Sequence, residues 1–180
     1  TGEITYTDST PAELSPVNSP EVNFPIYSEG AVLMDSSTGK VLYGKNEDEK
    51  LYPASTTKIL TAILAIEKCN LTDKITASKT AVMSIPSGYS NAAIQPGESL
   101  TVQDLLDLFL IHSANEVGFI FAEHISGSTE DFATLMNQKA AELGCKNTHF
   151  TNPSGLHDSE HYSTAYDMAL IARYCMKNET

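Results

Sequence analysis

Residues 51–68, LYPASTTKILTAILAIEK, combine a helix-forming hydrophobic run with polar residues that a buried helix does not need. The run extends from Ile59 to Ile66, and Lys58 stands directly before it, three residues after Ser55. Residues i and i+3 of a helix share a face, so the serine hydroxyl and the lysine amine can meet. Either Ser55 caps the helix while Lys58 extends to solvent, or the pair is a nucleophile and its general base.

The second interpretation has a definite chemical requirement. A serine hydroxyl is a poor nucleophile until a base takes its proton. Lys58 can be that base only if burial or neighbouring groups lower its pKa toward neutrality, and the adjacent hydrophobic run can supply the burial. The start of the helix would also stabilise negative charge that develops at Ser55. The S-x-x-K pattern is weak by itself, because both residue types are common.

Composition limits the class of protein. The chain has 180 residues, 41% of them hydrophobic, which is enough for one folded domain. Its formal net charge of −12 makes nucleic acid and anionic membranes poor partners. No hydrophobic run is long enough to span a bilayer, and no signal peptide is recognisable, so the start at Thr1 suggests a processed or trimmed chain. The three cysteines allow one disulfide and a free thiol, or three buried thiols, which we favour.

The pattern along the chain predicts an α+β domain preceded by an arm. Residues 1–27 contain four of the eight prolines and no basic residue, which indicates an extended or disordered arm or linker. The domain then occupies residues 28–180. Two short hydrophobic runs, 31–34 and 41–43, flank Ser-Ser-Thr-Gly and predict a β-hairpin.

Helices are predicted after the hairpin, and three of them begin at capping signals. Helices are predicted at residues 59–68, 105–111 and 115–127; one more opens at 128–131 and ends at Gly144, and a last one opens at 164–167 and runs to about Met176. The capping signals are Thr101–Asp104, Ser128–Asp131 and Thr164–Asp167. The helix at 115–127 is hydrophobic on nearly all sides, which predicts that it is buried. Residues 71–100 are mixed, with turns marked by proline and glycine.

A second short motif, Ser113-Ala-Asn115, lies between two hydrophobic helices. One interpretation is a plain turn with a helix cap. The other is that it supplies a second hydroxyl and an amide from a rigid turn that can face Lys58.

Together with a longer block, these motifs resemble a known family. PASTTKILTA (53–62), LIHSANEV (110–117) and NTHFTNPSGLHDSEHYSTAYDMALIA (147–172) are similar to the low-molecular-weight penicillin-binding proteins, the serine D-alanyl-D-alanine carboxypeptidases. The similarity runs from about Ala31 to Lys177, and the third block is the most distinctive part of it.

The resemblance implies a β-lactamase/transpeptidase-like fold, with a helical region and a small antiparallel sheet, and a role in peptidoglycan biosynthesis and cell shape. By resemblance, Ser55 is the acylated nucleophile, Lys58 its general base, Ser113 a proton relay and Asn115 a group that binds the substrate amide. The substrate would be a stem peptide that ends in D-Ala-D-Ala, and β-lactams would acylate the same serine. No metal or organic cofactor is expected, and the location would be outside the cytoplasmic membrane.

This sequence departs from the family pattern at two places. Glu116 replaces the usual aspartate, which we expect to be tolerated because that residue is not one of the motif's chemical groups. No K-T-G or K-S-G occurs, and the nearest match, Lys79-Thr80-Ala81, comes before the second motif. In the family this triplet lies on a strand beside the nucleophile. We therefore expect a truncated domain with an incomplete sheet, whose exposed edge could support self-association.

Two other functions stay open. A class A-like β-lactamase would need a glutamate in an E-x-x-x-N loop, which is not found between Asn115 and Thr180. A non-catalytic fragment that binds cell-wall peptide or a partner would explain the missing K-T-G.

Two further motif matches are expected to be coincidental. His157–His161 fits the H-x-x-E-H zinc motif, but Pro153 and Gly155 precede it, so we expect a polar loop. Residues 39–45 fit G-x-x-x-x-G-K, but Asn46 replaces the serine or threonine that would hold magnesium.

Overall fold

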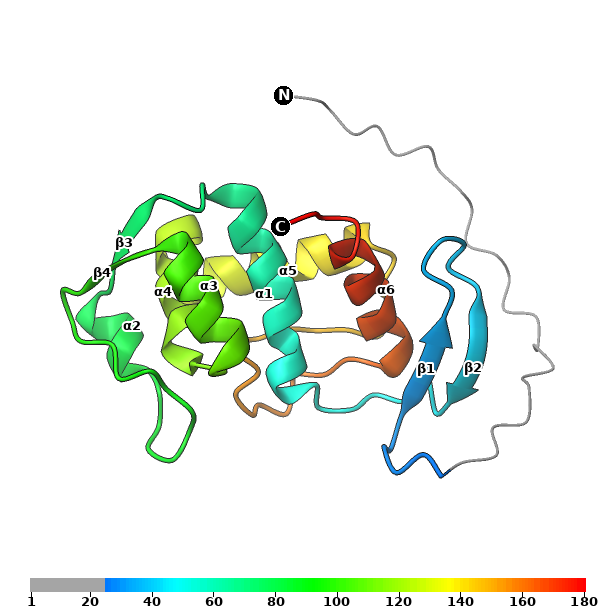
Figure 1. Ribbon diagram of the computed structural model, residues 1–180. Coiled ribbons are helices and arrows are strands. Elements are labelled where there is room, and N and C mark those ends of the chain that lie inside the picture. Colours follow the sequence, from blue (N-terminus) through cyan, green and yellow to red (C-terminus); the bar gives the residue numbers. More distant parts are fainter. Residues whose placement is uncertain (1–24) are drawn as a thin grey trace.

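The computed structural model describes residues 25–180 and divides them into a hairpin and a larger helical region (Figure 1). The hairpin pairs β1 (Ala31–Met34) with β2 (Val41–Lys45) in an antiparallel arrangement, with Leu33 opposite Tyr43. The predicted hairpin is therefore confirmed. The G-x-x-x-x-G-K match falls on β2, so no helix follows it that could hold a phosphate.

The helical region is built around α1. The helices are α1 (Lys58–Lys68), α2 (Lys79–Met83), α3 (Val102–Ile111), α4 (Asn115–Ser126), α5 (Thr129–Glu142) and α6 (Ala165–Cys175). Helix α1 contacts α3, α4, α5 and α6, and it lies in the middle of the region in Figure 1. One face of α1 packs into a core with Phe109 of α3, and another face packs into a second core with Phe132 of α5 and Ile171 of α6.

The helix starts follow the capping signals in the sequence. Thr101 and Asp104 form the predicted reciprocal capping box at the start of α3. The hydroxyls of Ser128 and Thr164 accept the predicted backbone bonds at the starts of α5 and α6. Helix α5 ends just before Gly144, whose φ of 89° is a left-handed conformation that favours glycine.

The stretch 71–100 contains a second small sheet that the sequence did not reveal. Strand β3 (Lys74–Thr76) pairs antiparallel with β4 (Ser99–Thr101), and the short helix α2 lies between them in the sequence. Three-residue strands are too short to show an alternating pattern, so only pairing across 20 or more residues defines them. The α+β class is confirmed.

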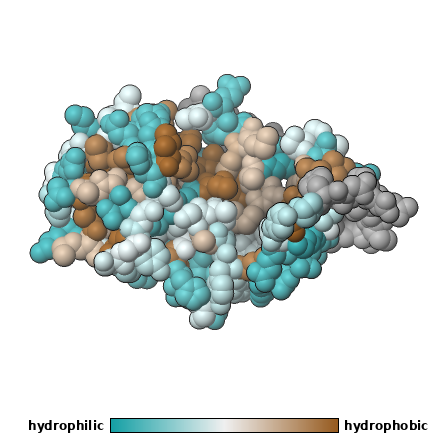
Figure 2. Space-filling view, turned by 60° about the horizontal axis from the view of Figure 1, so that its bottom comes forward, coloured by the Kyte–Doolittle hydropathy of each residue, from teal (hydrophilic) through white to brown (hydrophobic). Residues whose placement is uncertain are grey.

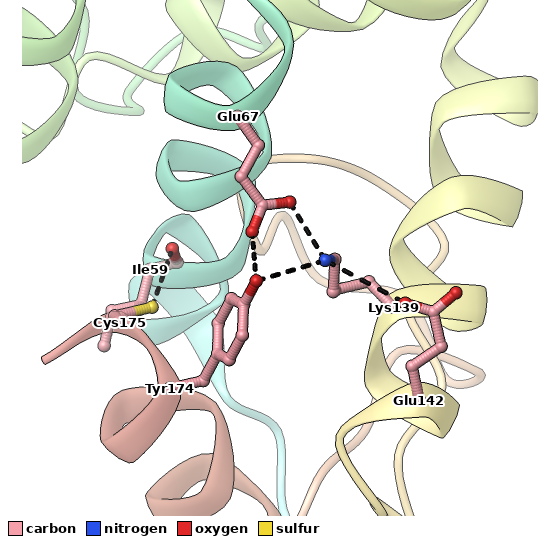
Figure 3. A network of polar contacts seen from close by, with 6 residues as sticks. All are labelled: Ile59, Glu67, Lys139, Glu142, Tyr174 and Cys175. Carbon is pink, nitrogen blue, oxygen red and sulfur yellow. Dashed lines mark hydrogen bonds and ion pairs between the residues drawn. The ribbon is translucent and has the colours of Figure 1, made fainter. Parts of the chain in front are cut away.

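A polar network ties the end of α1 to α5 and α6 (Figure 3). The Glu67 carboxylate lies 2.9 Å from Lys139 Nζ and also accepts a hydrogen bond from the Tyr174 hydroxyl. At the other end of α1, the Cys175 thiol of α6 faces the carbonyl of Ile59 at 3.9 Å. These contacts hold the helix that begins after Ser55 against its two neighbours.

The three cysteines are unpaired and half-buried, so no disulfide forms among them. Burial raises the pKa of the Cys145 thiol to about 12 and that of Cys175 to about 11, which keeps both in the unreactive thiol form at neutral pH.

Most of the predicted arm, residues 1–24, lies outside the described residues. At its end, the carbonyl of Ile26 accepts a hydrogen bond from Lys45 Nζ at 2.8 Å. Within residues 25–180, no helix has both the length and the hydrophobicity required to cross a bilayer.

Candidate active site

Ser55 lies on a tight turn that leads directly into α1. This 3-10 turn covers Ala54–Thr57, and Ala54 has a φ of 47°, which is uncommon for a residue with a side chain. Neither Pro53 nor Thr57, the residues at the N-cap positions, makes a side-chain capping bond. The Ser55 hydroxyl instead contacts Lys58 and Ser113. The interpretation of Ser55 as a helix cap is therefore wrong.

Lys58 is buried, with 3% of its surface exposed, so it does not extend to solvent. Its Nζ donates to Ser55 Oγ at 3.0 Å, to Asn115 Oδ1 at 2.8 Å and to the Ser154 carbonyl at 2.9 Å. These three acceptors account for all three hydrogens of an ammonium group. In the neutral amine, two hydrogens can stay on Asn115 and Ser154, and the lone pair then faces the Ser55 hydroxyl.

Burial lowers the pKa of Lys58 from 10.5 to about 8. The cause is desolvation, which disfavours the charged form. The Phe109 ring lies 5.6 Å from Nζ and forms part of this low-polarity surrounding. A substantial fraction of Lys58 is therefore neutral slightly above physiological pH, as a general base requires.

The second motif forms the turn between α3 and α4. Ser113 has a φ of 55°, and its hydroxyl donates to Ser55 Oγ at 3.2 Å. Asn115 is the first residue of α4 and presents its amide oxygen to Lys58. The structure thus brings together all four residues that the sequence analysis singled out, although they come from two regions almost 60 residues apart.

The Ser55 hydroxyl opens onto a shallow pocket of about 320 Å³. Its walls come from the start of α1 and the end of α3: Ser55, Thr56, Lys58, Ile59, Phe109, Leu110 and Ser113. Figure 2 shows the face at the lower end of the molecule, where hydrophobic residues gather in the middle between hydrophilic margins. A lining that combines hydrophobic side chains with a few polar groups is typical of a small-molecule or peptide site.

The distinctive block 147–167 wraps around the turn that carries Ser55. Leu51 and Ser163 exchange backbone hydrogen bonds, and the Thr61 hydroxyl donates to the Pro153 carbonyl at 2.7 Å. The Asn152 side chain accepts from the backbone N–H groups of residues 154, 155 and 156. This turn aims the Ser154 carbonyl at Lys58.

Gly155 packs directly against the backbone of Ala54, the residue before Ser55. A Cβ at this position would lie 1.8 Å from the Ala54 carbonyl oxygen, and the φ of Gly155 is 81°. Only glycine allows both this conformation and this distance.

The H-x-x-E-H stretch is a loop with turns, as predicted, and its second histidine is committed to protein contacts. His161 is buried, and its Nδ1 accepts from the Thr151 N–H at 3.1 Å. Nε2 therefore carries the hydrogen and donates to Thr57 Oγ1 at 2.8 Å. Burial lowers the pKa of His161 to about 4, which keeps it neutral. His157 lies instead at the surface against Tyr52.

Sequence reasoning missed the structural roles of four residues around the site: Ser154, Gly155, His161 and Glu116. The first three lie in the block that carried the resemblance, where Pro153 and Gly155 served only to predict a loop. Glu116 was expected to be a tolerated replacement, and this stays a prediction; the residue is almost fully buried, and its Oε1 accepts a hydrogen bond from the Ala92 N–H.

The family assignment follows from comparison with known proteins. The model of the peptidase S11 family, D-alanyl-D-alanine carboxypeptidase, matches residues 16–180. The chain belongs to this family.

Several D-alanyl-D-alanine carboxypeptidases are similar to this chain in sequence, and one is similar in its solved structure. The carboxypeptidase DacF of Bacillus subtilis is 46% identical over 158 residues, covering 85% of this chain and 40% of DacF. DacC of Escherichia coli is 41% identical and is covered over 38% of its length. The crystal structure of DacD from Francisella tularensis matches with a TM-score of 0.80 and 37% identity, over 87% of this chain and 38% of DacD.

A mutant of the Streptomyces K15 DD-transpeptidase has a TM-score of 0.81 and 30% identity, over 86% of this chain and 63% of that one. The β-lactamase/transpeptidase-like fold is therefore confirmed. The chain spans about two fifths of the length of the curated S11 relatives named above.

Proposed function

We propose that the protein to which this chain belongs is a serine D-alanyl-D-alanine carboxypeptidase that acts on peptidoglycan stem peptides. The observation that carries this proposal is the buried Lys58 amine, 3.0 Å from the hydroxyl of the exposed Ser55. Membership of the S11 family and the names of the relatives support the substrate class.

In the proposed reaction, the neutral Lys58 amine takes the proton of Ser55 as Oγ attacks the carbonyl of the penultimate D-alanine. Lys58 then gives up this proton, which Ser113, 3.2 Å from Ser55 Oγ, relays to the leaving nitrogen; the carbon–nitrogen bond breaks and free D-alanine departs. Water then attacks the ester on Ser55 while Lys58 accepts a proton from that water. Lys58 returns the proton to Ser55 Oγ as the ester bond breaks, and the shortened peptide leaves. The dipole of α1, which begins after Ser55, favours the negative charge formed at each addition step.

Asn115 is proposed to bind the substrate amide. Its side-chain nitrogen has two hydrogens, and one of them donates to the Ser90 carbonyl at 2.8 Å. The other hydrogen is available for a substrate carbonyl. The 180 residues contain no K-T-G triplet, so these residues do not themselves supply the lysine that the family uses for the substrate carboxylate.

Because its substrate is part of the cell wall, we place this protein outside the cytoplasmic membrane, as a secreted or surface-exposed enzyme. A role in cell shape follows from the same substrate. β-Lactams are proposed to acylate Ser55, because the strained amide presents a carbonyl to the same nucleophile.

The test is intact-mass measurement after incubation with a labelled penicillin. We expect a stable adduct on Ser55 that is absent from Ser55→Ala and present in Ser84→Ala, a change of an exposed serine at the end of α2. Rapid turnover of the drug without a lasting adduct would favour a β-lactamase-like enzyme. No reaction in any variant would favour a non-catalytic fragment that binds cell-wall peptide.

We also propose that the hairpin supports self-association. Within residues 25–180, β1 and β2 pair only with each other, and Leu33 on β1 is 57% exposed. Unpaired strand edges with hydrophobic side chains favour pairing with another chain. Sedimentation velocity is expected to show a mass that rises with concentration, and Leu33→Lys is expected to abolish that rise. A concentration-independent monomer in the unaltered chain would contradict the proposal.

A further inference from the structure

Glu116 is a buried acid that the proposed reaction does not use. It follows Asn115 in the first turn of α4, and only 1% of its surface is exposed. Its Oε1 accepts a hydrogen bond from the Ala92 N–H at 2.6 Å, whereas the buried Oε2 has no partner among the described residues. Burying a carboxylate is costly, and the N-terminal dipole of α4 offsets only part of that cost. A structural contact of Glu116 is therefore expected to offset this cost.

The segment that Glu116 holds lies against the second motif. The Ser90 carbonyl accepts from both the backbone N–H and the side-chain nitrogen of Asn115, at 3.0 and 2.8 Å. Ala92 lies two residues after Ser90, and its N–H donates to the Glu116 side chain. Ala93 has a φ of 56°, a left-handed conformation that costs on the order of 1–3 kcal/mol for a residue with a side chain. The conformation of 90–93 therefore depends on the contacts that hold it: the bond from the Ala93 N–H to Asn91 Oδ1 at 3.1 Å, within the segment, and the bonds to Asn115 and Glu116.

These contacts continue to the reacting atoms. Asn115 presents its oxygen to Lys58 and its nitrogen to Ser90. If the amide turned over, its NH₂ would face the donor Lys58 and its oxygen would face another carbonyl, and both contacts would be repulsive. Ser90 and Lys58 thus determine together which way the Asn115 amide points. The position of Ser90, in turn, depends on the anchor at Ala92.

We infer that Glu116 is a positioning residue of this site: its carboxylate anchors residues 90–93 so that the Ser90 carbonyl holds the Asn115 amide in its working orientation. This inference rests on the proposed function for its catalytic consequence. An aspartate would be shorter by one carbon–carbon bond, about 1.5 Å, so its carboxylate would reach the Ala92 N–H less well.

The anchor itself can be measured without any reaction. Hydrogen exchange, followed by NMR, reports the Ala92 backbone amide and the side-chain amide of Asn115. We expect Glu116→Ala to speed exchange at both positions about ten-fold or more, because a charge-assisted hydrogen bond is lost. Glu116→Gln keeps an acceptor oxygen and is expected to stay within about three-fold of the unaltered chain. Glu116→Asp is expected to lie between them.

The matched control is Glu123→Ala, two helix turns further along α4. Glu123 lines a separate pocket with Lys74 and His124, away from Ser55. This change is expected to leave exchange at Ala92 and Asn115 unaltered.

The consequence for the site is measured as the rate of acylation by a penicillin. Glu116→Ala is expected to lower this rate about ten- to a hundred-fold through misplacement of Asn115, with Glu116→Gln restoring most of it. Unchanged Ala92 exchange in Glu116→Ala would overturn the inference. So would a loss of acylation in Glu116→Gln as large as in Glu116→Ala, because the acceptor would then not be what matters.

Two outcomes separate this inference from the proposed function. If Glu116→Ala fails to fold, Glu116→Asp still decides the question, and exchange at Ala92 equal to that of the unaltered chain would overturn the inference. If no variant, including the unaltered chain, reacts with penicillin, the proposed function fails while the exchange rates still decide whether Glu116 anchors the segment.

Discussion

Replacing Lys58 by methionine is expected to slow acylation of Ser55 by a penicillin about 10²- to 10⁴-fold, the range typical of a lost general base. The methionine side chain fills a similar volume but cannot take the serine proton. It also leaves Asn115 Oδ1 and the Ser154 carbonyl without their donor. The loss should therefore exceed that of any change outside the Ser55–Lys58 pair.

The rate for the unaltered protein should also depend on pH in a defined direction. Burial lowers the pKa of Lys58 to about 8, and the proposed reaction uses the neutral amine as the base. Below that pKa the amine is protonated, so the rate should rise about ten-fold per pH unit up to pH 8 and level off above it. Lys58→Met should lose this dependence.

The control for Lys58 is Lys68→Met on the exposed last turn of the same helix. It should preserve both the rate and its pH profile. A Lys58→Met protein that is folded by circular dichroism and still acylated at the normal rate would exclude Lys58 as the base.

Replacing Gly155 by alanine is expected to reduce the free energy of unfolding by about 3–5 kcal/mol, a large effect for one methyl group. The added Cβ would lie 1.8 Å from the Ala54 carbonyl, which is backbone and cannot rotate aside. Either the Ser55 turn or the 152–156 turn must then move. Since the second turn carries the Ser154 carbonyl that binds Lys58, acylation should fall about a hundred-fold as well.

Gly127→Ala separates the steric clash from the backbone conformation. Gly127 has a φ of 83°, close to the 81° of Gly155, but nothing lies within 4 Å of its added Cβ. Its replacement should cost about 1 kcal/mol, the penalty for the left-handed conformation alone. Urea unfolding of both variants is the measurement. Equal losses would show that the contact between Gly155 and Ala54 does not matter.

Much of the local structure was predictable because its signals lie within a few residues. Thr101 and Asp104 are three residues apart, and each caps the other's backbone group, so the start of α3 can be located from the sequence. The spacing of Ser55 and Lys58 likewise required only one turn of backbone to bring their side chains together. The long block 147–172 identified the family, which in turn predicted the roles of Ser113 and Asn115.

The sequence by itself located the starts of α3, α5 and α6 and the hairpin, identified the family, and predicted the four residues expected to react or bind. Only the tertiary structure showed that Lys58 is buried and has three acceptors, that Gly155 must be glycine, that His161 bonds Thr57, and that Glu116 bonds the Ala92 N–H. The physical reason is distance along the chain. Helix caps and turns satisfy backbone groups within three or four residues, whereas the pKa of Lys58 and the fit of Gly155 depend on segments that meet only after the helices have packed.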